Sequence, residues 1–145
     1  MKILVLNGPN LNMLGIREPH IYGKETYQQL CQTILNYCKE KQIEVDIYQS
    51  NHEGDLIDKI QQAYFQHFQG IIINPGAYTH TSIALLDALK AVNLPTIEVH
   101  LSNIQQREDF RKISYVSLAS LQTISGEGIN GYIHAIDVLL KRTKI

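Results

Sequence analysis

An arginine and a tyrosine five residues apart, Arg17 and Tyr22, follow a stretch rich in amide side chains near the start of the chain. A phenol is almost wholly protonated at neutral pH, and a fixed positive charge within a few ångströms favours its anion. Tyr22 is therefore a candidate base, with Arg17 as the activating cation. The alternative is a surface arginine near a packed tyrosine. Both residues lie between Gly15 and Gly23, a span long enough to move as a lid.

A glutamate and a histidine two residues apart, Glu98 and His100, form a second candidate pair. Residues two apart on a strand share a face. A carboxylate fixes the tautomer of a neighbouring imidazole and supports its charged form. We therefore expect His100 to act as a general acid or base oriented by Glu98, the alternative being a solvated histidine at a strand end. Beyond it, Ser102 and the following N–H groups open a predicted helix and could hold a carboxylate.

Two further segments carry polar groups of the same kind. Asn74 precedes Pro75-Gly76, a pair that turns the backbone tightly beside a ligand, and its amide suits a hydroxyl or an enolate-type oxygen. His80 follows in the same loop, where it is either a ligand-binding residue or a helix-terminal histidine next to a cap at Thr79 or Thr81.

Arg107 and Arg111 are four apart, which places them on one face of a predicted helix. Either guanidinium could clamp a substrate carboxylate, or both could pair with Glu108 or Asp109. On its own, Asp87 has the pattern of a solvated helix carboxylate.

The residue types also bear on cofactors. Apart from Lys24, no lysine lies in a strand-end loop with an apolar environment, so a Schiff-base mechanism has no good candidate. No GxGxxG follows the first strand, and no His or Cys pair has zinc spacing. We therefore expect acid–base chemistry with neither cofactor nor metal.

Hydrophobic patterning predicts strands that alternate with helices along the whole chain. The inward stripe of the second helix is expected to include Tyr64 and His67, and that of the third helix Ile83. Such alternation predicts a parallel sheet covered on both faces, with ligands at the carboxyl ends of its strands. The predicted strands span residues 3–6, 43–48, 70–74, 96–99 and 122–125, and the helices 25–41, 55–68, 81–92, 103–112 and 131–141.

Composition limits the class of protein. The 145 residues suit one domain, 1–145, with 44% hydrophobic and 19% charged residues and a net charge of −1. The absence of a basic block argues against nucleic acid, and no apolar stretch approaches a membrane span. No signal-peptide pattern is present, and Cys31 and Cys38, seven apart on a predicted helix, are too distant for a disulfide. These features predict a cytoplasmic protein.

Several long motifs, in this order, resemble those of the type II 3-dehydroquinate dehydratases, and the resemblance covers nearly the whole chain. It implies a flavodoxin-like three-layer α/β sandwich with a five-stranded parallel sheet, assembled as a dodecamer of trimers. It also implies reversible dehydration of 3-dehydroquinate to 3-dehydroshikimate in the shikimate or quinate pathway, through an enolate and without a Schiff base. The motifs are NGPNLNMLGIREPHIYG (7–23), SNHEG (50–54), NPGAYTHTSIALLDAL (74–89), EVHLSN (98–103) and REDFR (107–111).

The resemblance also implies residue roles. Tyr22 removes a proton from C2, Arg17 favours its phenolate, and the enolate is stabilised near Asn10 through a bound water. His100 then donates a proton to the departing C1 hydroxyl. Substrate contacts are expected from Asn74, His80, Leu101, Ser102 and Arg111, with Asp87 reaching the site of a neighbouring subunit.

The chain departs from the family near its C-terminus, where Leu121, Gln122 and Glu127 are atypical, so the packing of the last strand or a subunit contact could differ. The fold alone would also permit a flavin- or phosphate-binding module without catalysis. Pro9 and bulky amides occupy the first loop, where a phosphate cradle needs Ser, Thr and Gly, and this disfavours that alternative. A purely structural role predicts no convergence of polar loops.

Overall fold

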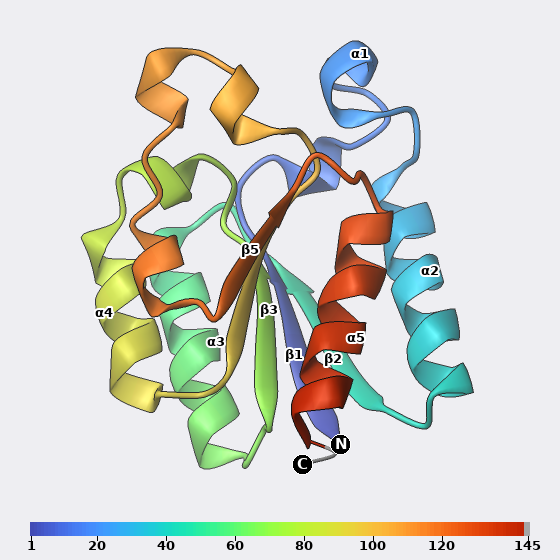
Figure 1. Ribbon diagram of the computed structural model, residues 1–145, viewed down its shortest axis with the longest axis vertical. Coiled ribbons are helices and arrows are strands. Elements are labelled where there is room, and N and C mark those ends of the chain that lie inside the picture. Colours follow the sequence, from blue (N-terminus) through green and yellow to red (C-terminus); the bar gives the residue numbers. More distant parts are fainter. Residues whose placement is uncertain (144–145) are drawn as a thin grey trace.

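The computed structural model describes residues 1–143 and contains a five-stranded parallel sheet (Figure 1). The strands lie in the order β2-β1-β3-β4-β5, and every neighbouring pair is parallel. The order reverses between β1 and β3, which creates the crevice where ligands bind in open sheets of this kind. The strands are β1 (Lys2–Asn7), β2 (Glu44–Gln49), β3 (Gly70–Asn74), β4 (Thr96–His100) and β5 (Gln122–Ser125).

Helices cover both faces of the sheet and give three layers (Figure 1). Helices α2 (Tyr27–Glu40) and α5 (Asn130–Thr143) cover one face, and α3 (Glu53–Phe65) and α4 (Ile83–Val92) cover the other. This flavodoxin-like architecture confirms the predicted fold class. The one-turn helix α1 (Pro19–Tyr22) stands above the carboxyl edge. The loops between these elements contain short 3-10 helices: η1 (Leu11–Met13), η2 (Gly76–His80), η3 (Ile104–Gln106), η4 (Asp109–Arg111) and η5 (Val116–Ala119).

The central strands supply both cores because alternate side chains point to opposite faces. In β1, Ile3 and Val5 join the α2–α5 side, while Leu4 and Leu6 join the α3–α4 side. All five residues of β3 are buried, as its run of β-branched residues predicts. No helix within residues 1–143 is long and apolar enough to cross a membrane.

The helix starts follow local capping chemistry. The Thr26 hydroxyl accepts a hydrogen bond from the Gln29 backbone N–H, and the Thr26 backbone N–H donates to Gln29 Oε1, which completes a capping box at α2. Helix α4 is capped by Ser82, not by Thr79 or Thr81 as considered from the sequence.

The predicted helix over residues 103–112 is wrong: the segment forms η3 and η4, and Arg107 between them has extended backbone. Of the two apolar side chains in this segment, Ile104 is buried and Phe110 is 68% exposed, so there is no apolar stripe to bury along a longer helix. Three inward positions were also wrong. Tyr64 and Ile83 are more than half exposed, and His67 is exposed in the turn after α3 ends.

The loops after β1 and β3 press against each other at two glycines. Gly8 donates its backbone N–H to the Asn74 carbonyl at 2.7 Å, and a Cβ added to Gly8 would lie 2.4 Å from the Pro75 carbonyl oxygen. Gly76 has φ +59°, and a Cβ there would lie 3.0 Å from the Pro9 carbonyl oxygen. In both cases the added Cβ would meet backbone atoms, so the loops could make room for it only if the strand ends moved.

We expect Gly8→Ala to lower the free energy of unfolding by about 2 kcal/mol or more, because the new methyl group collides with fixed backbone. Gly54→Ala is the matched control, since an added Cβ there meets nothing within 4 Å and alanine favours the helix. Urea denaturation of both variants tests this. Equal midpoints for Gly8→Ala and the unmodified chain would show that the loops are not tightly constrained.

Candidate active site

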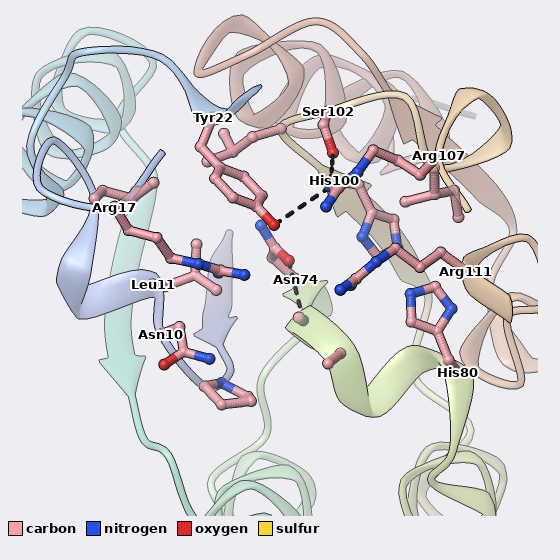
Figure 2. A pocket seen from close by; sticks show the side chains of 16 residues that line it. Asn10, Leu11, Arg17, Tyr22, Asn74, His80, His100, Ser102, Arg107 and Arg111 are labelled. Atoms are coloured by element: carbon pink, nitrogen blue, oxygen red, sulfur yellow. Dashed lines mark hydrogen bonds between the residues drawn. The ribbon is translucent and has the colours of Figure 1, made fainter. Parts of the chain in front are cut away.

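A pocket opens at the carboxyl edge of the sheet, between the segment that carries α1 and the loops after β3 and β4 (Figure 2). It contains about 640 Å³ of empty space, its open mouth included. Nine of the ten predicted site residues line it, and Asp87, exposed on α4, does not. The nine are Asn10, Arg17, Tyr22, Asn74, His80, His100, Leu101, Ser102 and Arg111.

The pocket wall is rich in positive charge. Arg17, Arg107 and Arg111 point toward its interior together with two histidines, and none of the acidic residues among 1–143 lines it (Figure 2). Guanidinium groups bind carboxylates well, because their fixed donors match the two oxygens. The site therefore favours an anionic ligand.

A buried carboxylate lies behind the pocket. Glu98 is fully buried on β4 and hydrogen-bonds His100, as predicted, while the hydroxyls of Thr79, Ser114 and Thr123 donate to its oxygens at 2.8–3.2 Å. Burial by itself would raise the pKa of Glu98, but the hydrogen bond and charge of His100, with the Thr79 and Ser114 hydroxyls, hold it below its ordinary value. Glu98 is therefore ionised at neutral pH.

This carboxylate decides which nitrogen of His100 faces the pocket. The Nε2–H group donates to Glu98, which leaves Nδ1 for a ligand. A neutral His100 accepts a hydrogen bond at Nδ1, and an imidazolium donates one there. Because Glu98 fixes the tautomer and the orientation of the ring, the arrangement is suited to proton transfer at Nδ1.

Tyr22 is held between two guanidinium groups. The Arg17 Cζ atom lies 4.4 Å from the centre of the Tyr22 ring, and the Arg107 Cζ atom lies 5.4 Å from it. Arg107 Nη1 also donates a hydrogen bond to the Tyr22 hydroxyl at 3.3 Å (Figure 2). Arg17 thus contacts the ring, whereas Arg107 contacts the oxygen that would carry the charge of a phenolate.

From the sequence, Arg107 and Arg111 were both left undecided between a substrate clamp and an ion pair with Glu108 or Asp109. In the structure Arg107 Nη1 donates to the Ser102 hydroxyl at 3.2 Å, and its Nε lies 3.8 Å from Glu108 Oε2. The same Glu108 oxygen lies 2.7 Å from Arg111 Nε. One carboxylate outside the pocket therefore holds two guanidiniums that point into it. The only sequence signal was the spacing of charges in the REDFR motif.

His80 and Asn10 reach the pocket from two loops. The Nδ1–H of His80 donates to the Ile113 carbonyl at 2.7 Å, and burial lowers the pKa of His80, so its Nε2 is an acceptor at neutral pH. Asn10 has φ +70°, a conformation that asparagine tolerates, and its backbone N–H donates to Asn51 Oδ1 at 3.0 Å.

The atypical residues near the C-terminus lie outside this pocket. Leu121 is 52% exposed, Gln122 is exposed at the start of β5, and Glu127 pairs with His134 at 3.1 Å. The residues that hold Glu98, namely Thr79, Ser114 and Thr123, were not identified from the sequence. Their hydroxyls reach one carboxylate from three separate segments, which no local spacing indicates.

Fold and pocket together define a flavodoxin-like α/β enzyme with a positively charged pocket at the carboxyl edge of its sheet. Residues 1–140 match the family model described as "Dehydroquinase class II". A protein named 3-dehydroquinate dehydratase from Caldicellulosiruptor bescii is 56% identical over 138 residues, 95% of each chain. A protein of that name from Clostridium beijerinckii is 52% identical over 139 residues, 96% of this chain and 95% of the relative.

Comparison with solved structures points to the same family. The crystal structure of type II dehydroquinase from Butyrivibrio crossotus has a TM-score of 0.95 and 59% identity, and the match covers 96% of this chain and 97% of that one. The chain belongs to the class II dehydroquinase family.

The buried carboxylate generates a test of stability against pH. Because the folded pKa of Glu98 is depressed, the stabilisation it supplies is present above its unfolded value near 4.5 and is lost as the pH falls through the folded value. We expect Glu98→Gln to be less stable than the unmodified chain at pH 6. Between pH 4.5 and pH 3, the variant should lose less further stability than the unmodified chain does. Urea midpoints across this range measure it. Glu44→Gln, which removes an exposed carboxylate, is the control, and parallel curves for Glu98→Gln and the unmodified chain would contradict the expectation.

Proposed function

We propose that this protein is a 3-dehydroquinate dehydratase, a hydro-lyase that converts 3-dehydroquinate to 3-dehydroshikimate in the shikimate pathway, which leads to aromatic amino acids. The observation that carries the proposal is a single positively charged pocket holding a guanidinium-bound phenol and a carboxylate-bound imidazole. Membership of the class II family, with relatives of that name above 50% identity, supports it.

The proposed reaction begins at Tyr22. Its phenolate, favoured by Arg17 and Arg107, removes a proton from C2 of the substrate, and the electron pair moves onto the neighbouring carbonyl oxygen to form an enolate. Asn10 stabilises this oxygen through a bound water. Return of the electron pair from the enolate expels the C1 hydroxyl, and the His100 imidazolium protonates it so that it leaves as water.

The remaining pocket residues would hold the substrate. Arg111, Ser102 and the Leu101 backbone suit its carboxylate, while Asn74 and His80 suit its ring hydroxyls. Both proton transfers use side chains of the chain itself, so the reaction as written requires no metal, cofactor or imine.

The proposal is tested by adding 3-dehydroquinate to the purified protein and following the ultraviolet absorbance of the conjugated enone. We expect Tyr22→Phe to lower kcat by at least about a hundredfold, because it removes the base. Arg107→Ala should lower kcat by about tenfold or more, because it removes the guanidinium that donates a hydrogen bond to the Tyr22 oxygen. His100→Ala should also lose most activity.

Matched controls are Tyr64→Phe and Lys112→Ala, which remove an exposed hydroxyl and an exposed cation outside the pocket. Chelator and borohydride should leave the rate unchanged. No enone from a folded protein would reject the proposed function and favour the flavin- or phosphate-binding alternative. Normal turnover in Tyr22→Phe would reject only the assignment of the base.

We further propose that the protein is a cytoplasmic homo-oligomer, a dodecamer built of trimers, in which Asp87 reaches a neighbouring site. Asp87 is exposed on α4 outside its own pocket, and α4 packs against η5. Nearby apolar side chains on these segments are left in solvent, which is typical of an interface: Ile83 is 54% and Leu118 67% exposed. Both cysteines are free, which suits a reducing compartment.

Sedimentation velocity tests the assembly. We expect a species of twelve 16.5 kDa chains, and smaller species for Leu118→Asp, because a buried unpaired carboxylate opposes association. Leu35→Asp, on helix α2 across the sheet, is the control. A monomer for the unmodified chain would contradict the oligomer, and cell fractionation tests the location.

A further inference from the structure

A fully buried tyrosine joins the ends of the two central strands beneath the pocket. Tyr132, in the first turn of α5, is 0% exposed, and its hydroxyl lies 2.6 Å from Asn7 Oδ1 and 3.0 Å from Asn74 Nδ2. Asn7 and Asn74 are the last residues of β1 and β3 and are partners in the strand register. Tyr132 does not line the pocket, whereas Asn74 does.

The hydrogen-bond donors and acceptors of Tyr132, Asn7 and Asn74 can be paired in only one way. The Tyr132 hydroxyl has one proton, which it donates to Asn7 Oδ1, so it must accept from Asn74. Only the Nδ2 atom of Asn74 can donate. Asn7 keeps its own orientation because its Nδ2 group donates to the Tyr27 hydroxyl at 3.4 Å.

The opposite end of the Asn74 amide is fixed as well. The Gly76 backbone N–H donates to Asn74 Oδ1 at 3.2 Å (Figure 2). A turned amide would place its NH₂ group against the Gly76 N–H and would lose a donor to Tyr132. With Oδ1 engaged and one N–H bound to Tyr132, the second N–H of Asn74 is left for the pocket.

We propose that Tyr132 is a positioning residue, whose hydroxyl orients the Asn74 amide so that it donates a hydrogen bond to a ring oxygen of the substrate. This inference rests on the proposed function of the pocket. Burial raises the pKa of Tyr132 above its ordinary value, so its proton is retained at neutral pH. His80 provides an acceptor and Asn74 a donor, and the two can therefore recognise different partners on a polyhydroxylated ring.

A double-mutant cycle tests the proposal, with kcat and KM measured for the unmodified enzyme, Tyr132→Phe, Asn74→Ala and the double variant. The phenylalanine keeps the ring and removes only the hydroxyl. We expect Tyr132→Phe to raise KM by about three- to tenfold with kcat within about twofold, as for loss of one neutral hydrogen bond. In the Asn74→Ala background the same change should leave KM unaltered, because Tyr132 acts through that amide.

The control is Tyr37→Phe, which also removes a hydroxyl bound to α5, where it meets Asp137, outside the pocket. It should change KM in neither background. A merely structural Tyr132 would give the same loss with and without Asn74, and that result would overturn the proposal, as would an unchanged KM in Tyr132→Phe. If Tyr132→Phe fails to fold, Asn7→Ala replaces it in the cycle, because it removes the acceptor and frees the tyrosine proton to turn the amide.

A crystal structure of Tyr132→Phe supplies a readout that needs no turnover. We expect the Asn74 side chain to leave Gly76 or to occupy two orientations, and an unchanged amide would overturn the inference. If the unmodified protein produces no enone, the proposed function fails while this structure still decides whether Tyr132 orients Asn74.

Discussion

The pairing of β1 with β3 in register is the constraint on which the site depends. It sets Asn7 beside Asn74 at the point where the strand order reverses, so the loops that follow leave the sheet in opposite directions. A pocket can form only because these loops separate. Before the two loops separate, Gly8 and Gly76 allow their backbones to approach closely. This contact fixes the floor of the pocket to the sheet.

The buried charge of Glu98 is the second feature that shapes the pocket. A carboxylate without exposure to water is costly unless its oxygens are paired, and Glu98 meets this condition through His100 and three hydroxyls from separate segments. The result is a negative charge behind His100 and an excess of positive charge in front of it. His100 thus lies between a buried carboxylate and three guanidinium groups, with Nε2 engaged by Glu98 and Nδ1 left for the pocket.

The Tyr22 side of the pocket is built differently. It lies on a segment whose backbone takes positive φ angles at Gly15, Glu18 and Gly23, and Tyr22 itself is only half-buried. Its ring packs against the edge of the core on the α2–α5 side of the sheet, and its phenol is contacted by Arg17 and Arg107. A buried His100 on β4 thus shares the pocket with Tyr22 on a segment that has glycine at both ends.

The sequence by itself determined the alternating elements, the parallel sheet and most of the pocket, because hydrophobic periodicity and strand-end chemistry are local properties. The Glu98–His100 pair followed from a spacing of two on one strand, and the motifs of the first loop identified the family. The helix predicted over residues 103–112 was wrong because this segment has no apolar stripe to bury: Ile104 is buried, but Phe110 remains exposed. Only the tertiary structure assigned Arg107 to the Tyr22 oxygen and Tyr132 to Asn74, since these contacts span 85 and 58 residues and depend on how helices and loops dock on the sheet.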